Sequence, residues 1–351
     1  MSRRCLLGVL VTIALVAIAW IPTAGQAAAQ GPAATQTYTP PLTPDGQPDL
    51  QGVWGYATIT PLERPPELAE KPVLTAQEAA DLERRTAEIQ DRDRRDHAST
   101  SERGSDGRTD LDRAYNQFWW DFGTKTVGTR QTSLVVDPPN GRIPPLTPEG
   151  QKRVRANRGL TTNSAREEGG AGRSFDSIAD RPLGERCLQW RTAGPPMVPG
   201  PYNNNVQLLQ SRDYVVILNE MIHEHRMVPL DGRPHLDPEV RQWMGDSRGH
   251  WEGSTLVVDT TNFSAKTAFQ GASEKLHLIE RFTRVAPDVL MYEFTVDDPT
   301  TFTQTWKAAI PMTLSQEPIY EYACHEGNYS MATILAGARA QEKALAEAAK
   351  D

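Results

Sequence analysis

The sequence lacks the short motifs that mark several widespread enzyme classes. Its 351 residues include no Gly-rich phosphate-binding loop, no His-Glu-x-x-His pair and no paired Cys-x-x-Cys. These absences count against nucleotide-dependent enzymes and against the common zinc proteases. The chain also has no basic block, and its formal net charge is −8 at pH 7. An acidic chain of this kind is a poor partner for nucleic acid or anionic lipid, so neither is expected to bind.

Long hydrophobic runs are scarce, and the clearest one lies at the N-terminus. Residues 1–29 combine Arg3 and Arg4 with an apolar run that begins at Cys5, and they end in small residues at Ala29. This order predicts a secretory signal peptide and a periplasmic or secreted mature chain. An uncleaved membrane anchor is the alternative. The export route, Sec or twin-arginine, stays open. No other stretch is long enough to span a membrane, so no membrane partner is expected after cleavage.

Cysteine is also scarce, with three residues in the whole chain. Cys5 lies in the predicted signal peptide, which leaves Cys187 and Cys324 in the mature protein. Two cysteines in an oxidising compartment most simply form one disulfide bond. The alternative is that Cys324 acts as a nucleophile beside His325.

The composition divides the mature chain into a short tether and one folded domain. Residues 30–50 are rich in Pro, Thr, Gln and Ala, which predicts a flexible N-terminal segment. Residues 51–351 are predicted to form a single β-rich domain. A helical insertion is predicted within it at residues 74–96, where Thr75 and Glu78 have the spacing of a capping box.

Short apolar runs follow one another from residue 206 to residue 312, with turn signals between them. This texture predicts a mainly β fold, an antiparallel meander that forms a calycin-like barrel, with a β-sandwich as the alternative. A long antiparallel sheet must close or cover its edges, which favours the barrel. A peripheral N-terminal helix and an Ala-rich C-terminal helix complete the predicted fold.

Two resemblances accompany this pattern. The Gly-Val-Trp at residues 52–54 resembles the Gly-x-Trp that opens lipocalin and calycin barrels, and this likeness implies a shape only. The segments PDLQGVW, GRIPPLTPEGQ, GPPMVPGPYNNN and YACHEGNY resemble those of a group of exported bacterial proteins over most of the mature chain. That resemblance supplies neither an activity nor catalytic residues.

The segment MIHEHR holds the first candidates for chemistry. His223 and His225 stand two apart in a run, residues 219–227, that reads as one β-strand. Residues i and i+2 of a strand point to the same side. In this register Glu224 and Arg226 face solvent, and both histidines face the inner wall of the barrel. A bulge or turn in the run would reverse these faces.

Two histidines on one face are candidate metal ligands, but a catalytic zinc ion usually takes three protein ligands. The third ligand would come from one of four other histidines, and the sequence does not choose among them: His235, His250, His277 and His325. A divalent metal bound by His223 and His225 therefore stays an alternative. The expected reaction types need no diffusible cofactor.

Histidine titrates near neutrality, so these residues are also candidates for acid–base catalysis. The catalytic candidates are His223, His225, His325 and Glu326, the last two being fixed beside Cys324 if the disulfide forms. The alternative role of His325 and Glu326 is to cap the final helix. The substrate-binding candidates are Tyr202, Asn203, Asn205 and Trp251. Asparagine both donates and accepts hydrogen bonds, although it also satisfies the backbone of turns.

The sequence thus predicts an exported enzyme, a hydrolase, lyase or isomerase. It would act on a small molecule or glycan by acid–base chemistry in a β-barrel cavity. The alternatives are a non-catalytic periplasmic ligand-binding protein and a structural protein of the cell envelope.

Overall fold

The computed structural model describes residues 38–91, 120–156, 175–190, 192–265 and 269–349. They belong to a compact unit that begins at Tyr38. The predictions for residues 1–29, for residues 30–37 and for residues 92–96 lie outside the described residues.

The described residues form ten strands, three α-helices and several short 3-10 turns. The strands are β1 Gly52–Gly55, β2 Val135–Asp137, β3 Asn205–Gln210, β4 Tyr214–Asn219, β5 His225–Pro229, β6 Asp246–Glu252, β7 Thr255–Thr261, β8 His277–Ala286, β9 Val289–Asp297 and β10 Trp306–Leu314. The helices are α1 Ala76–Gln90, α2 Pro148–Ala156 and α3 Tyr329–Ala348. The 3-10 turns are η1 Pro66–Leu68, η4 Ile178–Asp180, η5 Met221–His223 and η6 Phe269–Gly271.

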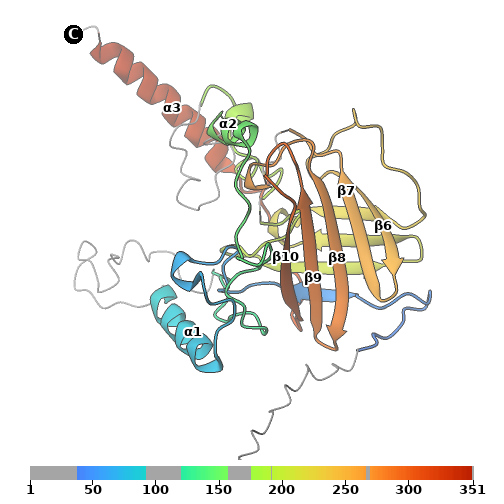
Figure 1. Cartoon of the computed structure of the whole chain (residues 1–351). Coiled ribbons are helices and arrows are strands. Elements are labelled where there is room, and N and C mark those ends of the chain that lie inside the picture. The colour runs from blue at the N-terminus through green and yellow to red at the C-terminus, as the bar shows by residue number, and fades with distance from the viewer. Residues whose placement is uncertain (1–37, 92–119, 157–174, 191, 266–268, 350–351) are drawn as a thin grey trace, which may run out of the picture. The chain divides into compact units, whose positions relative to one another are not determined.

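The strands build one antiparallel sheet that nearly closes into a barrel, as the sequence predicts. The strand order is β5-β4-β3-β1-β10-β9-β8-β7-β6, and β2 pairs with β10 off this path. Figure 1 shows β6 to β10 side by side in one curved wall. Strand β1 lies between β3 and β10. On either side of β1, strands that are neighbours in the sheet are also consecutive in the sequence.

The barrel has one seam, between β5 and β6, the two ends of the strand path. Nine strands joined by eight antiparallel pairings leave the end strands running in the same direction. An antiparallel ladder cannot join two such strands, and a parallel pair needs a long crossover. Here residues 230–245 connect β5 to β6 and run from one end of the barrel to the other. We call these residues the connection.

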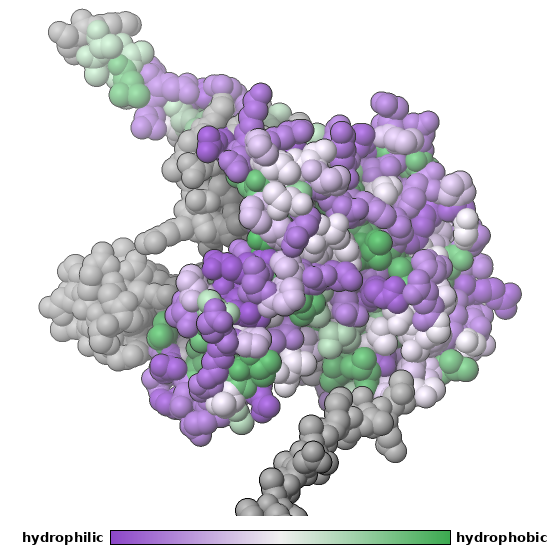
Figure 2. All heavy atoms as spheres, in the orientation of Figure 1, coloured by the Kyte–Doolittle hydropathy of each residue, from purple (hydrophilic) through white to green (hydrophobic). Residues whose placement is uncertain are grey.

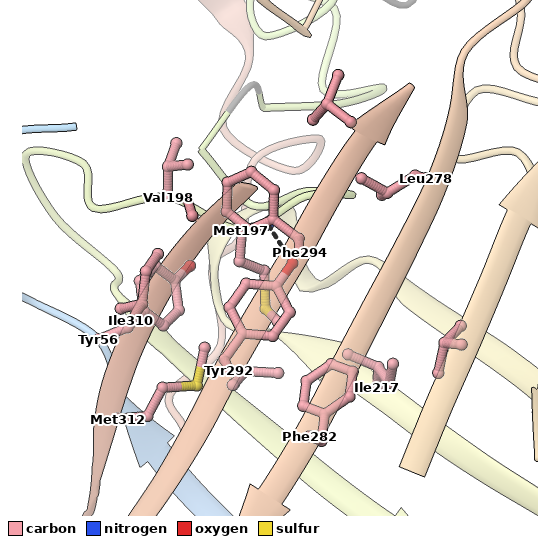
Figure 3. Packing of buried hydrophobic residues seen from close by; sticks show 14 of the residues in the cluster. Tyr56, Met197, Val198, Ile217, Leu278, Phe282, Tyr292, Phe294, Ile310 and Met312 are labelled. Atoms are coloured by element: carbon pink, nitrogen blue, oxygen red, sulfur yellow. Dashed lines mark hydrogen bonds between the residues drawn. The ribbon is translucent and has the colours of Figure 1, made fainter. Parts of the chain in front are cut away.

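Alternating side chains fill the barrel interior with hydrophobic residues. In β9, Leu290, Tyr292, Phe294 and Val296 are buried, and the residues between them are more exposed. Strands with this period bury one face and leave the other toward solvent. Figure 3 shows Tyr292, Phe294 and Phe282 packed inside the wall, with Met197 reaching in from outside the sheet. The interior of the barrel therefore contains a packed hydrophobic core.

One strand was not predicted, and one boundary differs from the predicted one. Strand β6, Asp246–Glu252, lacks a hydrophobic strand pattern. The folded part also begins before residue 51, because Leu50 is fully buried and its amide donates to Gln210 Oε1 over 2.6 Å. The Trp54 indole donates in turn to the Leu50 carbonyl over 2.9 Å.

The helices lie outside the barrel core. Helix α1 starts at the predicted capping box, with the Glu78 amide 3.2 Å from Thr75 Oγ1 and the Thr75 amide 2.9 Å from Glu78 Oε2. The Ala-rich helix α3 is confirmed, and its residues 339–349 are all exposed. None of the described helices is long and apolar enough to cross a membrane. The face drawn in Figure 2 is mostly hydrophilic, with hydrophobic residues in small separate patches.

The contact between β5 and β6 makes a first prediction. A Cβ atom at Gly249 would lie 2.7 Å from Leu230 Cδ2 and 2.8 Å from Val228 Cγ1. We expect Gly249→Ala to destabilise the protein by about 1–3 kcal/mol, because the extra methyl group forces the two walls apart. Urea unfolding measures the change. Gly128→Ala is the control, since a Cβ there would meet nothing within 4 Å; a comparable loss in both variants would contradict the prediction.

Candidate functional site

The two histidines of MIHEHR do not lie on one strand. Strand β4 ends at Asn219, η5 follows, and β5 begins at His225. Ile222 and His223 have φ values of 66° and 47°, in the left-handed region that β-branched residues rarely adopt. This turn reverses the predicted faces, so that His225 is exposed and Arg226 is buried. The prediction that both histidines face the barrel interior was wrong.

His223 lies instead beside the disulfide. Its Nδ1 atom is 2.8 Å from the carbonyl oxygen of Tyr322, and its ring centroid is 6.2 Å from that of His325. His223, His325 and Glu326 are all exposed. The structure therefore brings His223 and His325 together, whereas His225 lines a pocket whose lining includes neither of them.

The predicted disulfide is confirmed. Cys187 and Cys324 are bonded, with their Cα atoms 5.8 Å apart. The bond ties residues 182–190 to the segment before α3, where Asn328 Nδ2 also donates to the Glu185 carbonyl over 2.8 Å. Asn328, and neither His325 nor Glu326, occupies the N-cap position of α3.

The asparagines of PYNNN, residues 203–205, have structural roles in turns and in hydrogen bonds within the protein. Asn204, which the sequence analysis did not single out, is fully buried and bonds the Gly200 backbone and Asp121. Asn205 donates to Glu220 Oε2 over 2.8 Å. Asn203 occupies a turn with φ 54°. Burial raises the pKa of the Asp121 carboxyl above its ordinary range.

Tyr202 packs among aromatic rings. Its ring centroid lies 6.1 Å from the centroids of both Trp120 and Trp190. Trp251, on the other hand, lies on β6 near the β6–β7 turn and packs against the barrel core. The predicted substrate-binding residues therefore do not form one site.

The barrel interior contains one buried ion pair, which lies among hydrophobic side chains. Arg226 Nη1 and Nη2 donate to the Glu280 carboxylate over 2.5 and 2.9 Å. Tyr292 donates to Glu280 Oε1 over 2.8 Å and accepts from the Met197 amide over 3.1 Å, the bond dashed in Figure 3. Burial acts to lower the pKa of Arg226, but the charge and hydrogen bonds of Glu280 outweigh it, and the pKa is raised. Burial and the Glu280 charge hold the pKa of Tyr292 far above its ordinary value.

Several buried polar atoms near this ion pair have no partner among the described residues. They include both side-chain polar atoms of Asn219 and Nε of Arg226. Asn219 is 0% exposed and lies on the inner face of β4, with Val215 and Ile217. Ile217 pairs with Arg226 across β4 and β5, so Asn219 and Arg226 are diagonal neighbours on that face. Unpaired buried polar groups are rare enough in native proteins that each calls for a cause.

A pocket of about 670 Å³ lies where the seam begins, and we call it the seam pocket. Its lining comes from Glu224 and the start of β5, from the end of the connection, from the start of β6 and from one residue after β7: Glu224, His225, Arg226, Met227, Arg241, Gln242, Trp243, Met244, Gly245, Asp246, Ser247 and Ser264. No hydrogen bond joins the His225 imidazole to the rest of the described chain, so a ligand has free access to it. A second cavity, of about 330 Å³, lies beside the disulfide and has no histidine in its lining.

No family model, no curated protein and no solved structure matches this chain. The seam pocket is thus the best basis for a functional proposal, because it joins a cavity of ligand size to buried polar groups. As for metal ions, the described residues hold no group of three or more His, Cys, Asp or Glu side chains arranged as ligands.

One sequence signal in the pocket wall went unnoticed. Residues 245–249 read Gly-Asp-Ser-Arg-Gly, the spacing of the Gly-x-Ser-x-Gly elbow of α/β-hydrolases. That elbow needs a sharp turn between a strand and a helix. Ser247 lies inside β6 instead, with Oγ 2.9 Å from Thr260 Oγ1 on the neighbouring strand. The motif therefore does not form a nucleophile elbow here.

Proposed function

We propose that this chain is an exported protein that binds a small polar molecule in the seam pocket. The observation that carries the proposal is a pocket of about 670 Å³ whose lining includes Arg226, because Arg226 Nε and the side chain of its diagonal neighbour Asn219 are buried without partners among the described residues. A buried donor or acceptor without a partner costs about 1–3 kcal/mol, and a ligand that supplies the missing partner recovers that free energy. Export is supported by the signal-like residues 1–29 and by the disulfide, which is typical of oxidising compartments.

The unpaired atoms define the chemistry of the ligand group that reaches them. Asn219 offers the two N–H donors of its amide nitrogen and one oxygen acceptor, and Arg226 Nε offers a donor. The positive charge of Arg226 is already matched by Glu280. A neutral group that both accepts and donates, such as a primary amide or a hydroxyl, fits these atoms better than a carboxylate or an ammonium. Trp243 and Met227 in the pocket lining offer apolar contact to the rest of the ligand.

Three matched probes test this chemistry: benzamide, benzoate and benzylamine. We expect saturation-transfer NMR to detect benzamide in the seam pocket and to detect the two charged probes much more weakly. Asn219→Leu is expected to lower the affinity for benzamide about tenfold, because it removes the hydrogen bonds while it keeps the shape. Trp251→Phe is the control, since Trp251 lies at the other end of β6, and it is expected to leave the affinity unchanged.

The stability of Asn219→Leu gives a readout that needs no ligand. The substitution removes an unpaired buried amide, so the free protein is expected to be at least as stable as the wild type. A loss of about 2 kcal/mol or more would mean that the amide has partners within the protein, and the proposal would then fail. Equal binding of all three probes would exclude the proposed ligand class.

Acid–base catalysis in the same pocket is the second candidate function. It is favoured by His225, whose imidazole lines the pocket and makes no hydrogen bond to the rest of the described chain. Bound compounds would be incubated with the protein and their products identified by mass spectrometry. If His225 is the acid or base, His225→Gln slows conversion about 10²–10⁴-fold and leaves binding in place. Binding without any conversion would leave the binding function alone.

A further inference from the structure

A second group of ionisable residues lies on the outer face of the sheet, beside the seam pocket. His235, in the connection, has Nδ1 3.0 Å from Asp246 Oδ2 and Nε2 3.0 Å from Asp259 Oδ1. His277 has Nε2 2.9 Å from Asp259 Oδ2. These four side chains form one hydrogen-bonded chain across β6, β7 and β8, and we call them the outer cluster.

The outer cluster holds the first half of the connection against the sheet. Leu236 donates its backbone amide to Asp246 Oδ2 over 2.9 Å. Arg248 bonds both Asp246 Oδ1, over 2.7 Å, and the Pro234 carbonyl, over 2.9 Å. Asp246 lines the seam pocket as well. A change in the hydrogen bonds of Asp246 therefore alters a residue of the pocket wall.

The middle of the connection, Leu236 included, is also held by a group that does not titrate. The side-chain amide of Asn262 donates to the carbonyls of Leu236, Asp237 and Val240. The Gln242 amide donates to the Asn262 carbonyl over 3.0 Å. These bonds involve no titratable group, so a change in the protonation of the outer cluster should leave Gln242 in place.

His235 can donate to both carboxylates only when both ring nitrogens carry hydrogen. A neutral imidazole has one N–H donor, and its other nitrogen is an acceptor that cannot bond a carboxylate. Loss of one proton therefore breaks one of the two bonds that hold His235. Around the outer cluster, the charged groups are Asp246 and Arg248 on β6, Asp259 on β7, His277 on β8 and Asp297 on β9.

We propose that the outer cluster is a proton-dependent clamp that fixes the connection and so regulates access to the seam pocket. The clamp itself stands on the geometry of the cluster, and its regulatory consequence rests on the proposed function.

The sign of the pH dependence follows from two shifts. The hydrogen bond to Asp259 raises the pKa of His277 above its ordinary value of 6.5, so this stabilisation is complete below 6.5 and is lost as the pH rises through the raised pKa. Burial acts to raise the pKa of Asp259, but the hydrogen bonds and charges of His277 and His235 outweigh it, and the pKa lies below 3.8. That stabilisation is present above 3.8 and is lost as the pH falls through the lowered pKa. The clamp is therefore tightest between these limits and loosens as the pH rises through the raised pKa of His277.

Hydrogen exchange on the free full chain tests the clamp without a ligand. Exchange would be measured at about pH 5.5 and about pH 8.5, and the intrinsic rates would be divided by the measured rates to give protection factors. We expect the protection of the Leu236 amide to fall about tenfold or more at the higher pH, since His235 then holds the connection with one hydrogen bond fewer. The Gln242 amide is expected to keep its protection. His235→Gln should give low Leu236 protection at both pH values.

His250→Gln is the matched control, because His250 lies on β6 but bonds only Glu252, at 3.2 Å. It should respond to pH as the wild type does. In Asp259→Asn, the NMR titration of the His277 ring should shift to lower pH. A wild-type Leu236 amide without pH response, or loss of protection at Leu236 and Gln242 together, would overturn the clamp. The benzamide dissociation constant at both pH values tests the link to the pocket; an unchanged constant with a responsive Leu236 would overturn the regulatory role alone.

Discussion

Replacing Glu280 with leucine is expected to lower the free energy of unfolding by about 3–5 kcal/mol, because the substitution leaves the guanidinium of Arg226 charged and buried. The Arg226 side chain is only 4% exposed, and Glu280 is its one charged partner among the described residues. Tyr292 would also lose the acceptor of its hydroxyl proton. Urea unfolding of the purified chain would measure the loss.

The double variant Arg226→Met, Glu280→Leu removes both charges and keeps most of the side-chain volume, so it separates the effect of charge from the effect of packing. A buried pair that is replaced by apolar residues of similar volume is often neutral or more stable, so the double variant should recover most of the loss. Glu252→Leu is the control, because Glu252 forms a solvent-exposed ion pair with Arg281, the residue that follows Glu280 in β8. It should cause a much smaller loss. If the Glu280 and Glu252 variants lose equal stability, burial of the pair does not matter in solution.

The fold was predictable from the sequence where a strand alternates between hydrophobic and polar residues. Strand β9 shows this well, since Leu290, Tyr292, Phe294 and Val296 all face the core. Strand β6 escaped prediction because its inward positions are Ser247, Gly249 and the partly buried Trp251, which do not make a hydrophobic stripe. The seam also could not be foreseen, since it depends on the parity of the strand count.

The candidate site was harder to predict, because its main features depend on register. A turn with Ile222 in the left-handed region has no local sequence signal, and it reverses the faces of every residue after it. The burial of Glu280, however, could have been predicted from the sequence. It alternates with Leu278 and Phe282, so the pattern places a carboxylate on the buried face of β8. A buried carboxylate requires a partner, and Arg226 alternates with Val228 in the same way on β5.

Removal of the disulfide is expected to lower the free energy of unfolding by about 2–5 kcal/mol. Cys187 and Cys324 are 137 residues apart in the chain, so their bond closes a long loop and restricts the unfolded ensemble strongly. Neither cysteine belongs to the main barrel core, which predicts that the Cys187→Ser, Cys324→Ser variant still folds. Equilibrium unfolding in urea, with and without dithiothreitol, would compare the variant with the wild type.

The reductant and a control variant make this test specific. Dithiothreitol should bring the wild type to the stability of the double serine variant and should leave that variant unchanged. Cys5→Ser should retain the full response to reductant, since Cys5 is not part of the bond. Alkylation of protein isolated from the periplasm, followed by mass spectrometry, then links stability to compartment. If Cys187 and Cys324 are found as free thiols there, the disulfide no longer supports export. If they are protected until reduction, the bond that stabilises the fold also supports the proposed location, because a cytosolic chain would be kept reduced.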